Sequence, residues 1–310
     1  MFVARELLAR GEHVVGIDSM NAYYDPRLKA ARVAQLLERP GFSFKRIDLA
    51  DGSVVHELFS RHRFSRIAHL AAQAGVRYSI THPYAYIDAN VSGFLTLLEA
   101  ARAQPPEHLV YASSSSVYGA NSKLPFSVED PVDEPVSLYA ATKRANELMA
   151  QVYSRQFGLV ATGLRFFTVY GPWGRPDMAP MKFTRAILAG EPIDIYNHGD
   201  MQRDFTYIDD VASAVLRVLD RPPPDLGRTR HRLYNVGNHR PEPLMRFVEV
   251  LAGALGRTPQ MRMLPMQPGD VPATFADIET TRRDFGWEPT TPIDVGLPRM
   301  VSWYRNHFGA

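Results

Sequence analysis

The sequence predicts an α/β protein built on a parallel β-sheet with helices on both faces. In the first half of the chain, short apolar runs typical of buried strands alternate with amphipathic helical segments. Hydrophobic residues make up 45% of the chain and charged residues 22%, which indicates a packed globule rather than a disordered chain. The length of 310 residues is sufficient for one large domain or two of ordinary size.

The elements follow one another in a regular order. Gly11 ends the first helix, and Pro26 stands in the first turn of the second. Each strand is a short apolar run, and two of the runs lead directly into an aspartate. We expect helices at 2–10, 26–37, 54–61, 83–103 and 137–157, and strands at 13–17, 42–47, 66–71, 108–113 and 160–166.

Beyond Phe167 the chain is richer in proline and glycine, and its elements are shorter. We therefore expect two units. Residues 1–167 would form the sheet domain, to which 205–237 return, and 168–204 with 238–310 would form a smaller α/β lobe that binds the substrate.

The composition excludes several classes of function. Lys and Arg number 35 against 33 Asp and Glu, so the net charge of +2 gives no reason to expect a nucleic-acid or membrane partner. The absence of cysteine excludes disulfides, thiol nucleophiles and cysteine metal sites, and it fits a reducing cytoplasm. The ten histidines have no metal-ligand spacing, so we expect no metal. No apolar run reaches the roughly 18 residues of a membrane span, and the charged first residues do not resemble a signal peptide.

Ligands of parallel α/β sheets bind at the carboxyl ends of the strands. The residues that follow the predicted strands are therefore the first candidates for a site. They are Asp18, Asp48, Ala71–Gln73, Ser113–Ser116 and Phe166–Thr168.

Tyr139 and Lys143 are four residues apart on a predicted helix, so their side chains share one face. A phenol titrates near 10, and a nearby ammonium favours its ionised form, which would let Tyr139 act as a base. The spacing alone is weak evidence in a chain with 14 tyrosines. The serine run at 113–116, directly after a strand and before Val117–Gly119, makes the pattern specific, because a substrate oxygen would lie between serine and tyrosine.

In these motifs the sequence resembles the extended short-chain dehydrogenase/reductase family. The resemblance covers essentially the whole chain, through HLAAQAGVRYS, YASSSSVYG, SLYAATK, RFFTVYGPWGRPD, RDFTYIDD and QPGDVPATFAD. NAYYDPRLK and GPWGRPDMA look most like the UDP-glucuronate 4-epimerases. The resemblance implies a Rossmann-like doubly wound fold, NAD as cofactor, a UDP-sugar as substrate, and a homodimer formed through the helices at 83–103 and 137–157.

The resemblance also assigns residues. It implies Ser114, Tyr139 and Lys143 as the catalytic triad, and Asp18 as the partner of the adenosine ribose, which favours NAD over NADP. The remaining implied contacts are Asp48 and Leu49 at the adenine, Ala71, Ala72 and Gln73 at the cofactor diphosphate or ribose, and Arg203 and Asp270 at the nucleotide of the substrate.

The expected reaction is epimerisation at C4. Tyr139 would remove the proton of the 4-hydroxyl while hydride leaves C4 for NAD⁺; the 4-keto sugar would rotate and be reduced on its other face. A 4-keto uronate loses CO₂ readily, so its carboxylate must be held, and a bidentate arginine suits this task. Arg175 is the first candidate for that role and Arg77 the second. We also expect Ser115, Ser116 and Thr168 to contact the substrate.

Two alternatives remain open at this point. The first is a relative that decarboxylates the sugar, or another UDP-sugar epimerase or dehydratase. Related decarboxylases and dehydratases typically carry an acidic residue directly before VYG, where this chain has Ser116, which argues against them. Discrimination from other UDP-sugar epimerases depends on Arg175 and the overall motif match. The second alternative is a non-catalytic nucleotide-sugar-binding protein.

That second alternative arises from the start of the chain. A nicotinamide-binding sheet opens with a strand and a Gly-rich turn that holds the pyrophosphate, in this family GxxGxxG, and no such run is present here. The helix at 2–10 corresponds to the family's helix after that turn, so roughly 15–20 residues are missing. We expect that the natural protein begins upstream and includes the loop; a genuinely short form is the alternative.

Overall fold

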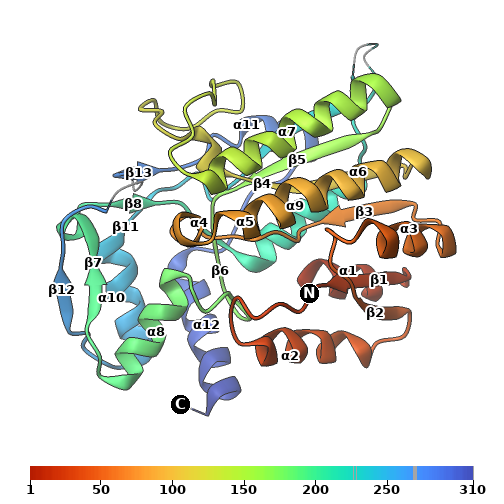
Figure 1. Cartoon of the computed structure of the whole chain (residues 1–310). Coiled ribbons are helices and arrows are strands. Elements are labelled where there is room, and N and C mark those ends of the chain that lie inside the picture. Colours follow the sequence, from red (N-terminus) through yellow and green to blue (C-terminus); the bar gives the residue numbers. More distant parts are fainter. Residues whose placement is uncertain (226, 228, 268–270, 310) are drawn as a thin grey trace.

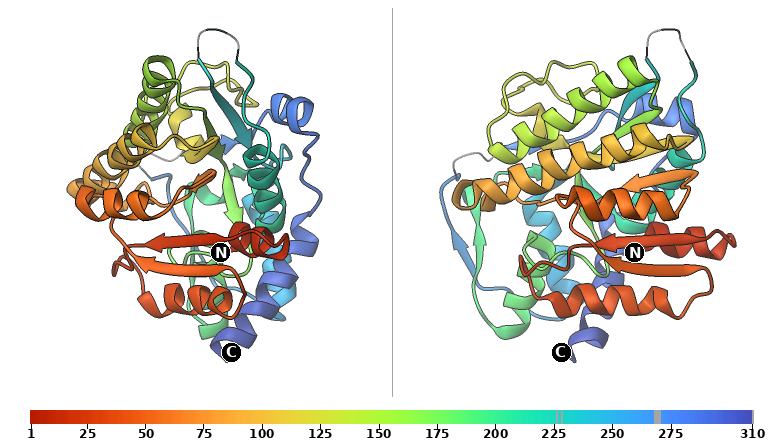
Figure 2. Two further views of the ribbon diagram at one scale, coloured as in Figure 1. Left: turned by 90° about the vertical axis from the view of Figure 1, so that its right-hand side faces the viewer. Right: turned by 45° about the vertical axis from the view of Figure 1, so that its right-hand side comes forward.

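A four-stranded parallel sheet forms the centre of the protein. The computed structural model describes residues 1–225, 227, 229–267 and 271–309. The sheet has the strand order β10-β5-β4-β3, and a separate parallel pair, β1-β2, lies beside it, with α2 along the pair (Figure 2). These strands are β1 (Val14–Asp18), β2 (Phe42–Arg46), β3 (Arg66–His69), β4 (His108–Ser114), β5 (Ala161–Phe166) and β10 (His231–Val236). The predicted parallel α/β fold is therefore confirmed, with strand ends within two residues of those expected.

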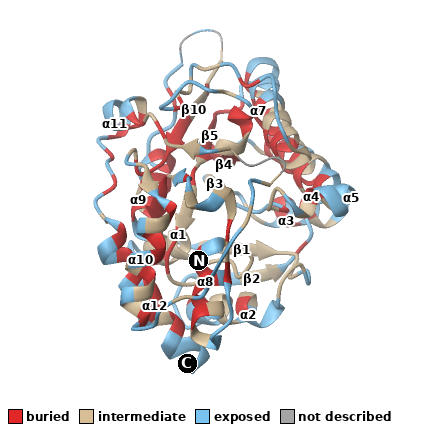
Figure 3. Ribbon diagram, turned by 90° about the vertical axis from the view of Figure 1, so that its left-hand side faces the viewer, coloured by how far each residue is buried: buried red, intermediate tan, exposed pale blue. Residues whose placement is uncertain are grey.

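Helices cover both faces of the sheet. Neighbouring residues of β4 face opposite ways. Leu109 belongs to a core with α3, α6 and α7, and Val110 to a core with α9 and α11 (Glu279–Phe285). Figure 3 accordingly shows α7 and α9 on opposite sides of β3, β4 and β5. The helices of this part are α1 (Phe2–Ala9), α2 (Pro26–Leu37), α3 (Gly52–Arg61), α6 (Gly93–Ala103), α7 (Leu138–Phe157) and α9 (Ile208–Leu219).

Capping residues explain where several of these helices begin. The carboxylate of Asp25 accepts from the N–H of Arg27 ahead of α2, with Pro26 at the first helical position. Ser137 accepts from the N–H of Ala140 at 3.1 Å and so caps α7. Gly158, in the left-handed conformation, ends α7. The start of α7 is thus fixed, and this is where Tyr139 lies.

The helix predicted over 83–103 is present with the expected ends and contains a π-helical turn that the sequence did not predict. It divides into α5 (Pro83–Tyr86), a π-helical turn η1 (Ile87–Ser92) and α6, and the short α4 (Tyr78–Thr81) precedes it. The cause is Asn90, whose carbonyl accepts a hydrogen bond from Asn146 of α7 at 2.6 Å. The side chain of Asn90 bonds both the N–H and the carbonyl of Gln73, so the turn ties the segment after β3 to α7.

Most of the remaining elements are grouped at one end of the parallel sheet, at the lower left of Figure 1, whereas α11 packs against β10. The core of this part lies between α8, α10 and α12 and contains Phe247 and Leu297. Figure 3 shows the buried faces of α10 and of α9, the helix that covers the neighbouring sheet. None of the described helices combines the length and the apolar character needed to cross a membrane. The elements are β6 (Thr168–Tyr170), α8 (Ala179–Ala189), β7 (Ile193–Ile195), β8 (Gln202–Arg203), β9 (Phe205–Tyr207), β11 (Glu242–Pro243), α10 (Leu244–Leu255), β12 (Met261–Met263), β13 (Ala273–Thr274), α11 (Glu279–Phe285) and α12 (Ile293–Phe308), with the 3-10 turns η2 (Ser115–Tyr118) and η3 (Tyr196–Gly199).

Candidate active site

Ser114, Tyr139 and Lys143 meet where β4 ends and α7 begins. Ser114 is the last residue of β4, and its hydroxyl lies close enough to the phenol of Tyr139 to influence its pKa. Lys143 lies one helical turn after Tyr139; it is 2% exposed, and its Nζ donates to the carbonyl of Ala112 at 2.9 Å. The structure therefore brings together the three residues that the motifs single out.

The electrostatics of this group differ from the expectation in one respect. Burial raises the pKa of Tyr139, and the neighbouring hydroxyl of Ser114 and the positive charge of Arg175 oppose that rise. Burial also lowers the pKa of Lys143, to about 8. Arg175 is thus a further cation that influences the phenol, and the ammonium of Lys143 is bonded to the backbone of β4.

The four serines at 113–116 differ in their hydrogen bonds and their burial. Ser114 Oγ donates to Ser116 Oγ at 3.1 Å and accepts from the N–H of Ser116 at 3.2 Å, which fixes the turn η2. Ser115 and Ser116 are half-buried at the same edge of the sheet. Ser113 is buried instead, and its hydroxyl donates to Glu147 at 2.7 Å. Ser115 and Ser116 are therefore partly accessible at this edge, whereas Ser114, like Ser113, is buried.

A buried ion pair behind the site was missed in the sequence. Glu147, one turn after Lys143, accepts from Nε and Nη2 of Arg165 at 2.8 and 2.9 Å, and both side chains are almost fully buried. Arg165 belongs to β5, so this pair and the bond from Ser113 join α7 to two strands. The i, i+4 spacing of Lys143 and Glu147 was a usable signal, since it places Glu147 on the helix face that meets the sheet.

Arg175 lies in the loop between β6 and α8, close enough to Tyr139 to influence its pKa. Its guanidinium is bonded to the carboxylate of Asp177, which also accepts from the hydroxyl of Tyr23 at 3.1 Å. Asp177 was not considered from the sequence, although it follows Arg175 by two residues in the GRPD motif. Trp173 of the same loop packs against Trp303, with ring centroids 5.2 Å apart, and so anchors the loop on α12.

The other predicted substrate contacts occupy different positions. Thr168 is half-buried at the start of β6, directly beyond the end of β5. Arg77 lies over the ring of Tyr196, 4.6 Å from its centroid, and Arg203 on β8 donates to the carbonyl of Pro272 at 3.0 Å. Asp270 lies outside the described residues.

The first group of predicted cofactor contacts lies at the carboxyl ends of β1 and β2. Asp18 ends β1, and its carboxylate, 40% exposed, accepts from Lys29 Nζ at 3.0 Å. Asp48 is exposed, and its carboxylate accepts from the N–H of Ala50 at 3.0 Å, while Leu49 is buried beside it. Both carboxylates can therefore be reached from solvent.

The remaining cofactor contacts follow β3. Ala71 and Ala72 are exposed. Gln73 is buried, and its backbone is held by Asn90. Small exposed side chains followed by a fixed backbone give a ligand close access to this part of the edge.

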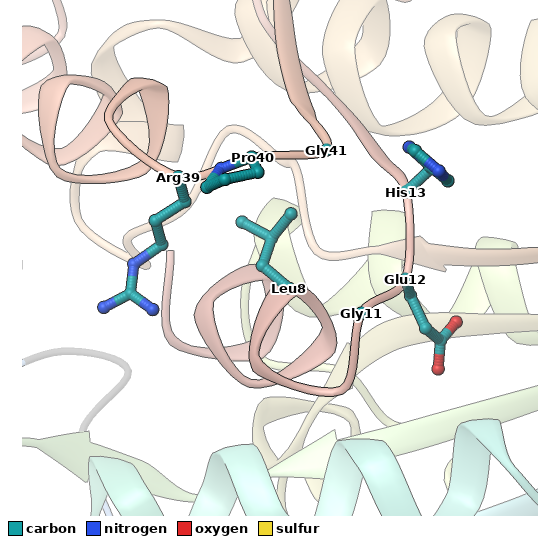
Figure 4. Close-up of a pocket in the computed structure, with 7 residues that line it drawn as sticks. All are labelled: Leu8, Gly11, Glu12, His13, Arg39, Pro40 and Gly41. Carbon is teal, nitrogen blue, oxygen red and sulfur yellow. The ribbon is translucent and has the colours of Figure 1, made fainter.

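A pocket at the opposite edge of the sheet is shown in Figure 4. It lies between the turn after α1 and the turn before β2, at the amino ends of β1 and β2. Its Glu12 is bonded to Arg66 at 2.6 Å. The pocket is therefore separate from the group around Tyr139, and ligands of parallel sheets bind at the other edge. Its lining residues are Leu8, Gly11, Glu12, His13, Arg39, Pro40 and Gly41.

The chain is similar to known proteins over nearly its whole length. Residues 2–237 match the NAD dependent epimerase/dehydratase family. The chain is 46% identical over 319 residues to the "Probable UDP-glucuronate 4-epimerase" of Rhizobium meliloti (strain 1021), which covers 99% of this chain and 94% of that one. It is 47% identical over 315 residues to UDP-glucuronate 4-epimerase 6 of Arabidopsis thaliana, with 98% of this chain and 68% of that one covered.

The fold is likewise similar to a solved structure. The crystal structure of UDP-glucuronic acid 4-epimerase from Bacillus cereus, in complex with UDP-glucuronic acid and NAD, superposes with a TM-score of 0.89 at 29% identity. The match covers 98% of this chain and 95% of that one, so it includes the region around Tyr139 and the loop that carries Arg175.

Proposed function

Because the chain belongs to the NAD dependent epimerase/dehydratase family, we propose that it interconverts UDP-glucuronate and UDP-galacturonate, with NAD as its cofactor. The observation that supports this most directly is the position of Arg175: a guanidinium lies within electrostatic reach of the candidate acid/base Tyr139. A sugar whose 4-hydroxyl reaches Tyr139 would then have its carboxylate next to a cation.

The residues at the carboxyl ends of the strands fit NAD. We assign Asp18 to the adenosine ribose, because an exposed carboxylate pairs with a 2′-hydroxyl and repels a 2′-phosphate. The start of α1 lies within electrostatic reach of Asp18, so a helix N-terminus faces the same edge. We assign Asp48 and Leu49 to the adenine, and the segment Ala71–Gln73 to the diphosphate or ribose.

Tyr139 is assigned the proton transfers at the 4-hydroxyl oxygen of the sugar. When bound, the nicotinamide accepts hydride from C4 and returns it to the opposite face. Tyr139 takes the proton of the 4-hydroxyl and later returns it to the 4-keto oxygen, and Ser114 holds that oxygen by a hydrogen bond. Ser115, Ser116 and Thr168, which are half-buried just beyond the ends of β4 and β5, are assigned to orient the sugar.

Arg175 is assigned the carboxylate of the uronate. In a 4-keto uronate, CO₂ is lost when the breaking bond aligns with the ketone π system. A guanidinium that binds the carboxylate through two donors opposes this alignment. Arg77, against the ring of Tyr196, is the second candidate. Arg203 and Asp270 are assigned to the UDP portion.

The identity of residue 116 favours epimerisation over decarboxylation. Ser116 is bonded to Ser114 at the position where related decarboxylases and dehydratases carry an acid. Without that acid, the site offers Tyr139 as the group that exchanges protons with the sugar. Epimerisation needs no other acid or base, because the same proton leaves and returns.

We further propose that the protein acts as a cytoplasmic homodimer. Exposed apolar side chains lie on both α6 and α7, the helices expected at the dimer contact. Two apolar helix faces of this kind favour association with a second copy. The exposed residues are Leu95, Leu148, Val152 and Phe157.

Proton NMR of UDP-glucuronate with NAD⁺ and this protein tests the proposal, both for the chain as printed and for a form extended upstream. We expect UDP-galacturonate to appear and Tyr139→Phe to prevent its formation. Release of CO₂ as the main result would instead identify a decarboxylase, and faster conversion of UDP-glucose would identify a UDP-glucose epimerase. Binding of UDP-glucuronate by both forms without turnover of either would identify a binding protein.

A further inference from the structure

Asp177 holds Arg175 along one edge of its guanidinium. Nε donates to Oδ1 at 3.1 Å and Nη2 to Oδ2 at 2.9 Å, so the planar groups meet in a bidentate pair. Among the described residues, Nη1 has no hydrogen-bond partner. On the edge formed by Nη1 and Nη2, Nη2 also donates to the sulfur of Met178 at 3.3 Å, a weak acceptor that a carboxylate oxygen would replace, so this edge can bind a second carboxylate through Nη1 and Nη2.

The carboxylate of Asp177 also contacts Tyr23. The hydroxyl of Tyr23 donates to Oδ2 of Asp177 at 3.1 Å. Burial, together with the negative charge of Asp177, raises the pKa of Tyr23 to about 12, so it remains a donor at neutral pH. The neighbouring Gly75 leaves room for this contact, because a Cβ there would lie 2.8 Å from the hydroxyl.

A second contact joins the same two segments. Nη2 of Arg32 donates to the carbonyls of Trp173 and Gly174 at 2.7 and 3.2 Å. Its Nη1 donates to the hydroxyl of Tyr24 at 2.6 Å. The segment from Tyr23 to Arg32 thus holds both the backbone of the Arg175 loop and the carboxylate that orients its arginine.

We propose that Asp177, supported by Tyr23, is a positioning residue that makes the site selective for a uronate; this rests on the proposed function. Asp177 holds one edge of Arg175 so that the other edge stands beside Tyr139 before substrate binds. Restricting a long side chain in advance reduces the entropy that binding would otherwise cost. A fixed guanidinium also limits rotation of the carboxylate of the 4-keto sugar, which opposes loss of CO₂.

Calorimetry with UDP-glucuronate and UDP-glucose tests this inference, because only the first carries the carboxylate. We expect Asp177→Ala to weaken UDP-glucuronate binding by about tenfold, and to leave UDP-glucose within about twofold of the wild type. Asp177→Asn and Tyr23→Phe should give smaller losses of the same selectivity. In turnover, the fraction of UDP-glucuronate that releases CO₂ should rise in each variant.

Two further variants separate positioning from folding. In an Arg175→Ala background, Asp177→Ala should cause no additional loss, since it acts through Arg175. Asp294→Asn removes the partner of Arg246 on the surface and serves as the matched control, with unchanged selectivity expected.

The outcomes distinguish this inference from the proposed function. Normal selectivity in Asp177→Ala, with selectivity lost in Arg175→Ala, would overturn the inference and leave the proposed function intact. Tighter UDP-glucuronate binding by Asp177→Asn would also overturn it, because Asp177 would then compete with the substrate for Arg175. Normal selectivity in Arg175→Ala would overturn both assignments.

Discussion

Lys143 donates from Nζ to the carbonyl of Ala112 at 2.9 Å, two residues before Ser114 on the same strand. The helix that carries Tyr139 is thereby bonded to the strand that carries Ser114. This contact places the ammonium beneath the site, and the burial that results lowers the pKa of Lys143 to about 8. The alignment of α7 on β4 is thus part of the active-site geometry.

Replacement of Tyr139 by phenylalanine tests the acid/base assignment. Loss of a general acid/base lowers turnover by about 10²–10⁴-fold, so Tyr139→Phe should lower the rate of epimerisation by at least that amount. Calorimetric binding of UDP-glucuronate should change little, since the ring remains. Tyr153→Phe, on the same helix but bonded to Glu99, is the matched control and should retain turnover. An unimpaired rate in Tyr139→Phe would remove Tyr139 from the mechanism.

Replacement of Arg175 tests the carboxylate assignment. Arg175→Ala should weaken UDP-glucuronate binding by about 10–100-fold, as expected for a lost charge-assisted pair, or increase the release of CO₂. Arg175→Lys should restore only part of the function, because an ammonium cannot form the bidentate pair. Arg77→Ala is the comparison, and NMR with CO₂ detection gives the product ratio. If Arg77→Ala alone releases CO₂, the carboxylate site is at Arg77.

The sequence predicted those features that depend on local patterns. Apolar runs located the strands, Ser137 and Gly158 mark the ends of α7, and the four-residue spacing placed Tyr139 and Lys143 on one face. Tertiary contacts between distant segments were not accessible in this way. Tyr23 and Asp177 are 154 residues apart, and no local pattern indicates that they meet.

Two other features were not predicted for the same reason, because they depend on contacts between segments that are far apart in the sequence. The π-helical turn at Asn90 exists because Asn146, on another helix, takes its carbonyl. Arg175, expected only as a carboxylate ligand, also acts on the pKa of Tyr139, because the loop after β6 returns to the start of α7. The proposed division into a sheet domain and a smaller lobe stays a prediction.

Removal of one partner from the buried pair of Glu147 and Arg165 should be strongly destabilising. Glu147→Ala leaves the guanidinium of Arg165 buried without its partner, which typically costs about 3–5 kcal/mol of the free energy of unfolding. Urea unfolding followed by circular dichroism measures this loss. Because α7 carries Tyr139 and Lys143, we expect turnover by the folded fraction to fall as well.

A double variant separates the lost partner from the lost volume. Glu147→Leu with Arg165→Met removes both charges and keeps apolar bulk, so it should recover much of the stability that Glu147→Ala loses. Equal destabilisation in the single and double variants would show that packing, rather than the unpaired charge, accounts for the effect.

His69 predicts how stability depends on pH. It is 7% exposed, and burial, with a smaller contribution from the charge of Lys143, lowers its pKa to about 3. Its ring stacks on Phe94, with centroids 5.3 Å apart. An unfolded histidine titrates near 6.5, so between that pH and about 3 the unfolded chain binds a proton that the folded chain does not. Stability is therefore retained above pH 6.5 and falls as the pH is lowered.

A pH of 5 is about 1.5 units below the pKa of an unfolded histidine. The buried His69 should therefore lower the free energy of unfolding by about 2 kcal/mol at pH 5. His69→Phe keeps the ring and removes the proton site, so its loss of stability between pH 7 and pH 5 should be smaller than that of the wild type by this amount. Urea unfolding at the two pH values measures the difference. His108 and His231, whose pKa burial lowers to about 4, remain in both proteins and cancel. His56→Phe, at an exposed position of α3, is the matched control, and its stability should depend on pH as that of the wild type does. If the stability of His69→Phe also had the pH dependence of the wild type, His69 would take up its proton in the folded state.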